Sequence, residues 1–155
     1  MTPNQKAFLD TIAHSELGAQ ILVSSNNGYN VIVGSTASKL ILFDSYADHP
    51  RKLVQIRPGL ASTAAGRYQL LARYFDVYKR QLGLEDFSPH AQDMIALQQI
   101  KECRALNLID AGNFNEAIEK CAHIWASLPG AGYGQHENKM DDLRLAYVRA
   151  GGIFA

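Results

Sequence analysis

The 155-residue chain lacks features that would each point to a particular class of protein. Its longest apolar run, residues 40–43, is far below the roughly 18 residues of a membrane-spanning helix. Fifteen basic and fifteen acidic residues cancel, so the basic excess typical of nucleic-acid-binding proteins is missing. We therefore expect neither stable membrane association nor a nucleic-acid partner.

Cysteines and clustered metal ligands are also scarce. Cys103 and Cys121 are too few for a disulfide framework, and we expect both to be reduced, buried packing groups. The five histidines are scattered without the spacing of a zinc site, so no metal and no cofactor are expected. No apolar segment of a secretory signal follows the first residues, which predicts accumulation in the cytoplasm.

The amino-acid composition is that of a globular protein. Hydrophobic residues make up 47% of the chain and charged residues 19%, with no linker, repeat or low-complexity tract. This composition and length predict one domain over residues 1–155.

The first helix ends on a carboxylate. Thr2 and Gln5 have the spacing of a capping box, and Phe8, Ile12 and Glu16 then recur every four residues on one helical face. Burial among apolar neighbours and the negative end of the helix dipole both raise the pKa of a carboxyl group. Glu16 is therefore a candidate general acid, although this stretch alone is more typical of a glutamate that turns into solvent.

Residues 19–57 alternate short β-favouring runs with turn residues. We expect strands at 21–23, 29–33, 40–43 and 53–56, with a hairpin turn at Asn27-Gly28. Such a sheet is too small to stand alone and must pack beside helices.

The remainder has helical periodicity. We expect one helix ending at Gly83, one that begins at Ser88-Pro89, one that begins at Asn113 and a last helix ending near Gly151. The fold class predicted from the residues is α+β, with a mainly helical lobe and a small antiparallel sheet.

Two glycine-rich segments contain the same combination of residue types, namely glycine, an aromatic residue and an amide. They contain Tyr68 and Gln69 in residues 66–69, and Tyr133 and Gln135 in residues 130–135. Exposed backbone, ring faces and neutral amides suit an uncharged, hydroxyl-rich ligand such as a sugar chain. Plain turn chemistry is the alternative for each segment taken singly.

Several of these segments together resemble the endolysins of lambda-type phages, in order along nearly the whole chain. The segments that carry the resemblance are residues 6–10, 15–16, 28–34, 48–54, 66–71, 81–84, 86–89 and 124–135. The resemblance implies a lysozyme-like fold and a lytic transglycosylase, with Glu16 as the single catalytic glutamate. Gly66 to Gln69 also resembles the Gly-x-x-Gln motif of other lytic transglycosylases. This chain departs from the family where Ser15-Glu16 is followed by Leu17 instead of glycine.

The expected function is cleavage of the MurNAc–GlcNAc bond of peptidoglycan by a monomer, which lyses the host after release to the cell wall. In a transglycosylase the sugar's own 6-hydroxyl attacks, so one group serves as acid and then as base. One alternative is a hydrolytic muramidase in which Asp44 or Asp48 is the second carboxylate. Another is a non-catalytic glycan-binding phage protein.

Overall fold

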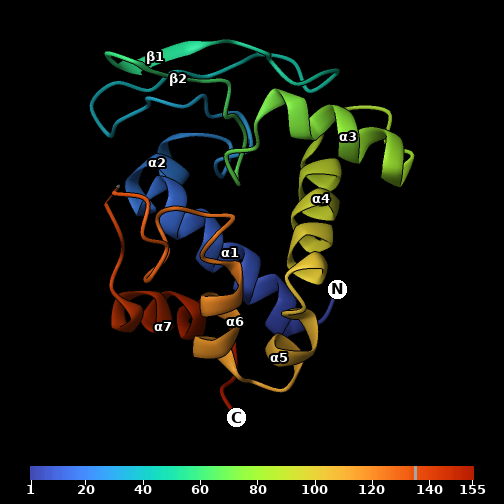
Figure 1. The fold of residues 1–155 in the computed structure, drawn as a ribbon, viewed down its shortest axis with the longest axis vertical. Helices are drawn as coiled ribbons and strands as arrows, with labels where there is room; N and C mark the ends of the chain where they lie inside the picture. Colours follow the sequence, from blue (N-terminus) through green and yellow to red (C-terminus); the bar gives the residue numbers. More distant parts are fainter. Residues whose placement is uncertain (135) are drawn as a thin grey trace. The chain divides into compact units, whose positions relative to one another are not determined.

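The computed structural model describes residues 1–134 and 136–155. Figure 1 traces its elements from blue to red, and these are α1 (Pro3–Leu17), α2 (Ala19–Ser24), β1 (Val54–Arg57), β2 (Leu60–Ser62), α3 (Ala72–Leu82), α4 (Pro89–Glu102), α5 (Leu106–Asp110), α6 (Phe114–Cys121) and α7 (Met140–Arg149). This mixture of helices with a small antiparallel sheet confirms the α+β prediction. Within the described ranges, no helix combines the length and the apolar character that crossing a bilayer requires.

The chain divides into two compact units. The terminal unit comprises Met1–Glu16 and Ala96–Ala155, and the central unit comprises Leu17–Ile95. The sequence predicted a single domain over residues 1–155, and the division into two units does not test this prediction.

Helix α1 begins with the predicted capping box. The Gln5 backbone N–H donates to Thr2 Oγ1 at 3.1 Å, and the Thr2 backbone nitrogen donates to Gln5 Oε1 at 3.3 Å. The same two side chains also donate to the Asp110 carboxylate at the end of α5. The start of α1 is thereby anchored to a second helix of the terminal unit.

An aromatic cluster lies at the centre of the terminal unit. Phe114 of α6 has ring contacts with Phe8 of α1, Tyr147 of α7 and Phe154 of the C-terminal segment. Helices α6 and α7 agree with the predicted ones, although the side chain of Asn113 forms no capping hydrogen bond. Helix α5 was not predicted, because five residues are too few to display a helical period.

The sheet of the central unit is smaller than predicted. Strand β1 pairs with β2 in antiparallel register, and β2 was missed because its three residues follow Pro58-Gly59 directly. The expected strands at 29–33 and 40–43 contact each other through an isolated bridge, Val31 to Leu42. The side chain of Ser35 supports this segment, since Ser35 Oγ donates to the Ile32 carbonyl at 2.7 Å and accepts from the Ile41 N–H at 2.9 Å.

The strand expected at residues 21–23 is wrong, because these residues belong to helix α2. Short apolar runs do not distinguish a strand from a buried helical turn, and here Ile21 is the buried residue of α2. The turn at Asn27-Gly28 does form, with positive φ at both residues and a Tyr29 N–H to Asn26 carbonyl bond of 2.9 Å. It follows α2 and does not join two strands, so the turn was correct and the hairpin was not.

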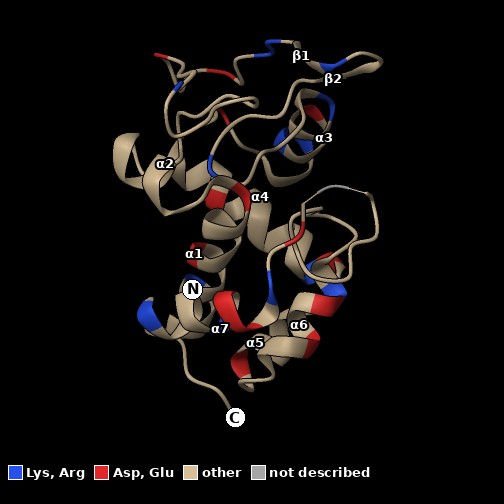
Figure 2. Ribbon diagram, turned by 90° about the vertical axis from the view of Figure 1, so that its left-hand side faces the viewer, with Lys and Arg blue, Asp and Glu red and all other residues tan. Residues whose placement is uncertain are grey.

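Helices α3 and α4 agree with their sequence signals. Gly83 adopts the left-handed conformation that ends α3, and the Ser88 hydroxyl accepts from the Ala91 N–H at the start of α4. Figure 2 shows basic residues on α3, and its last turn carries Lys79 and Arg80, where cations complement the helix dipole. Phe75 and Phe87 pack edge to face in the core of the central unit.

Candidate functional site

Glu16 lies at the end of α1, half-buried, in the terminal unit. The Ser127 hydroxyl donates to Glu16 Oε2 at 2.6 Å. Burial raises the pKa of Glu16 from 4.5 to about 7, and the Ser127 hydrogen bond lowers it in part. The direction agrees with the sequence argument, and the alternative of a solvated helix end does not describe this side chain.

Two further residues extend the contact between Ser127 and Glu16. Ser15 Oγ lies 2.8 Å from Ser127 Oγ, and Asn138 Nδ2 donates to both Ser15 Oγ and the Ser15 carbonyl at 3.0 Å. The Asn138 amide also contacts the Ser127 carbonyl at 3.3 Å, and the Asn138 backbone N–H donates to that same oxygen at 2.8 Å. Sequence reasoning missed Ser127 and Asn138, since neither has a spacing that relates it to Glu16.

The glycine-rich loop of the terminal unit is closed by a carboxylate. Glu137 accepts from the Gly130 N–H at 2.9 Å and from the Gly132 N–H at 3.0 Å, and these two bonds hold the pKa of Glu137 below its ordinary value. The Tyr133 hydroxyl donates to the His123 carbonyl, and Tyr133 is 56% exposed. Its role in stacking against a sugar stays a prediction. Gln135 lies outside the described residues.

In the central unit, the segment around Gly66 is held by a buried amide. Gln92 Oε1 accepts from the Arg67 N–H, while Gln92 Nε2 donates to the carbonyls of Tyr29 and Phe87, all at 2.9 to 3.0 Å. Gln69 follows with a positive φ of 52°, and its Nε2 donates to the Gly66 carbonyl at 2.8 Å. This bond orients the half-buried amide of Gln69, whose role in substrate binding stays a prediction.

Tyr68 does not offer the exposed stacking face that the sequence suggested. Its side chain is 5% exposed, and its hydroxyl donates to Asp93 Oδ1 at 2.7 Å. A ring this buried has no free face on which a sugar could stack.

Tyr68 belongs to a polar cluster that sequence reasoning missed. The Tyr29 hydroxyl also donates to Asp93, and the Arg67 guanidinium lies over the rings of both Tyr29 and Tyr68. Burial and the Asp93 charge raise the pKa of Tyr29 to about 12, so its hydroxyl stays a proton donor. Asp93 carries no local signal, because α4 presents it from 25 residues beyond Tyr68.

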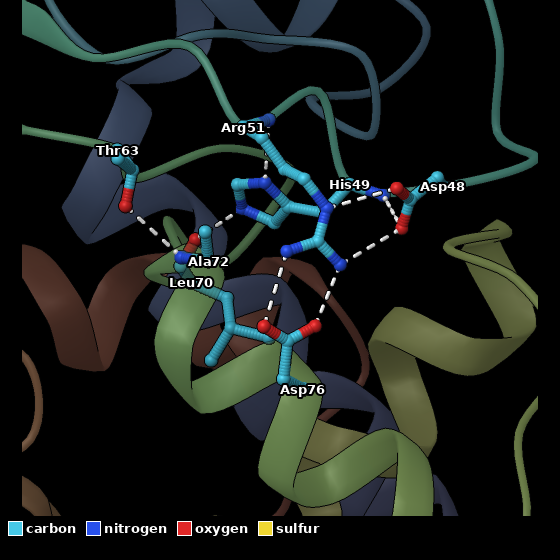
Figure 3. Close-up of polar contacts among 7 residues, drawn as sticks. All are labelled: Asp48, His49, Arg51, Thr63, Leu70, Ala72 and Asp76. Atoms are coloured by element: carbon cyan, nitrogen blue, oxygen red, sulfur yellow. Dashed lines mark hydrogen bonds and ion pairs between the residues drawn. The ribbon is translucent and has the colours of Figure 1, made fainter.

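Asp48, a candidate second carboxylate, forms an ion pair with Arg51. Figure 3 shows the Arg51 guanidinium between Asp48 and Asp76, with bonds of 2.8 Å and 2.6 Å. The Arg51 hydrogen bonds hold the pKa of Asp48 below its ordinary value, which makes this carboxylate a weak base. Asp44, the other candidate, is exposed.

The loop that carries Asp48 is fixed by a buried histidine. In Figure 3, His49 Nε2 lies 2.8 Å from the Leu70 carbonyl, and His49 Nδ1 accepts from the Arg51 N–H at 2.9 Å. These partners require a neutral ring with its proton on Nε2. Burial lowers the pKa of His49, in agreement with that form.

The predicted site residues are thus divided between the units. Glu16 and Tyr133 belong to the terminal unit, whereas Tyr68, Gln69 and Asp48 belong to the central unit. In the described ranges, no group of three or more His, Cys, Asp and Glu side chains is arranged to hold a metal ion.

Comparisons with known proteins agree on one family. The Endolysin family matches residues 6–154. The endolysin of Escherichia phage lambda is 56% identical over 151 residues, which are 96% of this chain and 91% of that protein. The endolysin of Escherichia phage P2 is 46% identical over 155 residues, with 97% and 94% covered.

Solved structures give the same answer for the fold. The structure of bacteriophage lambda lysozyme complexed with a chitohexasaccharide matches with a TM-score of 0.91 and 53% identity, covering 100% of this chain and 98% of that one. A second structure of lysozyme from bacteriophage lambda matches with a TM-score of 0.88 and the same identity and coverage. The predicted lysozyme-like fold is therefore confirmed.

Proposed function

Because the chain belongs to the Endolysin family of peptidoglycan-cleaving enzymes, we propose that it is a lytic transglycosylase in which Glu16 is both acid and base. It cleaves the MurNAc–GlcNAc β-1,4 bond and leaves 1,6-anhydro ends on the muramic acid residues. The observation that carries this proposal is the half-buried Glu16 carboxyl, whose pKa is raised to about 7.

A carboxyl group with this pKa is suited to both halves of the reaction. Its protonated form donates to the leaving oxygen of the glycosidic bond. The resulting carboxylate then accepts the proton of the muramic acid 6-hydroxyl as that oxygen attacks the anomeric carbon. The proton that Glu16 gave is replaced by the one it takes, so the group is restored and no water is consumed.

The ion pair of Asp48 favours this scheme over hydrolysis. A hydrolytic muramidase needs a second carboxylate to activate water or to stabilise charge. Asp48 accepts two hydrogen bonds from Arg51, and its lowered pKa makes it a poor acceptor for a proton from water. The exposed Asp44 leaves hydrolysis as the alternative that an experiment must separate.

The proposed ligand is a peptidoglycan glycan strand. The related lambda lysozyme was solved as a complex with a chitohexasaccharide, an uncharged sugar chain. In this chain the exposed Tyr133 ring and the oriented Gln69 amide are the groups that suit sugar binding. We further propose that the enzyme accumulates in the host cytoplasm and acts on the wall at lysis, as a monomer.

Digestion of purified cell walls in heavy-oxygen water tests the mechanism. A transglycosylase leaves unlabelled muramic acid ends that borohydride does not reduce, whereas a muramidase leaves labelled, reducible ends that are heavier by one water. Glu16→Gln serves as the blank for nonenzymatic cleavage. Labelled ends as the main product would overturn the proposal, and intact walls would favour a non-catalytic glycan-binding protein.

A further inference from the structure

A directed chain of hydrogen bonds ends on Glu16. It runs from Asn138 through Ser15 and Ser127 to Glu16 Oε2, entirely within the terminal unit. We propose that Ser127, oriented by Ser15 and Asn138, is a positioning residue that selects the reacting oxygen of Glu16 and stabilises its ionised form. The inference rests on the proposed role of Glu16 and adds to it how one carboxyl group alternates between acid and base.

The donor-to-acceptor direction of this hydrogen-bond chain follows from the number of hydroxyl and amide protons available. Asn138 faces the carbonyl oxygens of Ser15 and Ser127, which accept only, so its NH₂ side must face them. A serine hydroxyl has one proton, and that of Ser127 goes to Glu16 Oε2. Between the two hydroxyls Ser15 is therefore the donor, and Ser15 Oγ accepts from Asn138.

This direction makes the two carboxylate oxygens of Glu16 different. In the ionised carboxylate, Oε2 already accepts the hydrogen bond from Ser127. The transferable proton is thereby left to Oε1. In the ionised state the same 2.6 Å bond is charge-assisted, which makes it stronger than a bond between neutral groups.

Charged neighbours do not replace Ser127 in this role. His14 lies two residues before Glu16 on α1, and Glu137 directly precedes Asn138 on the glycine-rich loop. Glu137 directs its carboxylate to the N–H groups of Gly130 and Gly132. In the described part of the chain, neither His14 nor Glu137 forms an ion pair or hydrogen bond with Glu16. Burial opposes the charged form of Glu16, and the Ser127 hydroxyl favours it.

Carboxyl NMR titration of Glu16 in the ligand-free protein tests the inference, with Glu16→Gln used to assign the signal. Ser127→Ala removes a hydrogen bond to the ionised form, so the pKa of Glu16 should rise by about one unit. Ser127→Cys keeps the size of the side chain with a weak donor and should shift the pKa in the same direction. Ser127→Thr, which retains the hydroxyl, should restore the wild-type value.

A second set of variants tests whether Asn138 orients Ser15 and Ser127. Asn138→Ala should shift the pKa of Glu16 in the same direction by less, because Ser15 loses its partner but Ser127 remains. Asn107→Ala is the control, since Asn107 is an exposed residue of the same unit and its side chain has no hydrogen bond among the described residues. In the pH–rate profile, the alkaline limb should shift to higher pH in Ser127→Ala and keep its wild-type position in Asn107→Ala.

The outcomes are separable from those of the proposed function. A Glu16 titration that is the same in Ser127→Ala, Ser127→Cys and the control would overturn the inference, even if the melting temperature falls. If Ser127→Ala does not fold, Ser127→Cys and Asn138→Ala decide the matter. Labelled, reducible products would refute the transglycosylase mechanism and leave a shifted Glu16 titration standing.

Discussion

The backbone N–H and C=O groups of the two units find their hydrogen-bond partners in different ways. In the terminal unit, helices α5, α6 and α7 and most of α1 satisfy their own backbone and pack around an aromatic cluster. In the central unit, residues 25–53 contain no helix or named strand, and side chains supply many of the missing partners. Ser35, His49 and Gln92 each connect backbone groups of separate segments.

The difference explains where sequence patterns predict well. A helix is decided by residues three and four positions apart, and its apolar face is visible as a period. An irregular segment is decided by which distant carbonyl or N–H its polar side chains reach, and no period records that. Substitutions in the two units should therefore fail for different reasons.

The largest expected effect is on chemistry in the terminal unit. Glu16→Gln should lower the rate of cell-wall clearing at least about 100-fold, because it removes the transferable proton. A folded variant that retains more than roughly a tenth of wild-type activity would show that Glu16 is not the acid.

The same variant should become more stable at high pH. The folded-state pKa of Glu16 is raised from 4.5 to about 7, so its favourable contribution is present below pH 4.5 and is lost as the pH rises through 7. Glu16→Gln should therefore be more stable than wild type at pH 8, by up to about 3 kcal/mol, and about equal at pH 4. Denaturant unfolding at both pH values measures this, and equal stability at pH 8 would contradict it.

The next largest effect is on stability in the central unit. Gln92→Ala removes three hydrogen bonds, two buried and one partly buried, and should lower the free energy of unfolding by about 2–4 kcal/mol. Gln81→Ala on the exposed face of α3 is the matched control and should change it by less than about 0.5 kcal/mol. Similar losses in both variants would mean that the buried amide has no special role.

A smaller effect on stability, with a clear effect on activity, is expected for Gln69→Ala. The replaced amide is half-buried and donates to the Gly66 carbonyl at 2.8 Å and more weakly to the Val31 carbonyl at 3.4 Å, so the melting temperature should change little. Cell-wall clearing should fall, because a neutral donor and acceptor for the sugar is lost. Normal specific activity with a large loss of stability would assign Gln69 to the fold alone.

The smallest effect is expected for the two thiols of the terminal unit. Cys103 and Cys121 are buried and free. Cys103→Ser and Cys121→Ser should each keep wild-type activity under oxidising and reducing conditions, since neither thiol takes part in the proposed reaction. An activity switch on adding oxidant, lost in either variant, would establish a redox bridge instead.

Much of the helical framework could be predicted because its signals are local. The capping box of Thr2 and Gln5, the Ser88 cap and the left-handed Gly83 were all readable in the sequence. The errors concern short segments, where α2 was taken for a strand and β2 and α5 were missed. The six residues of α2 and the five of α5 span less than two helical periods, and the three of β2 span less than two strand periods, so packing decides their conformation.

The sequence by itself determined the position of at least one end of most helices, the Asn27-Gly28 turn, the resemblance to the endolysins and the choice of Glu16 as the candidate acid. These depend on neighbouring residues or on order along the chain. Only the tertiary structure decided the state of Glu16, because its partner Ser127 is 111 residues away and its raised pKa comes from burial. It likewise decided that the ring of Tyr68 is buried and that Asp48 is held by Arg51. The physical reason is that desolvation and hydrogen-bond partners depend on everything packed around a group, whereas propensity depends on the next few residues.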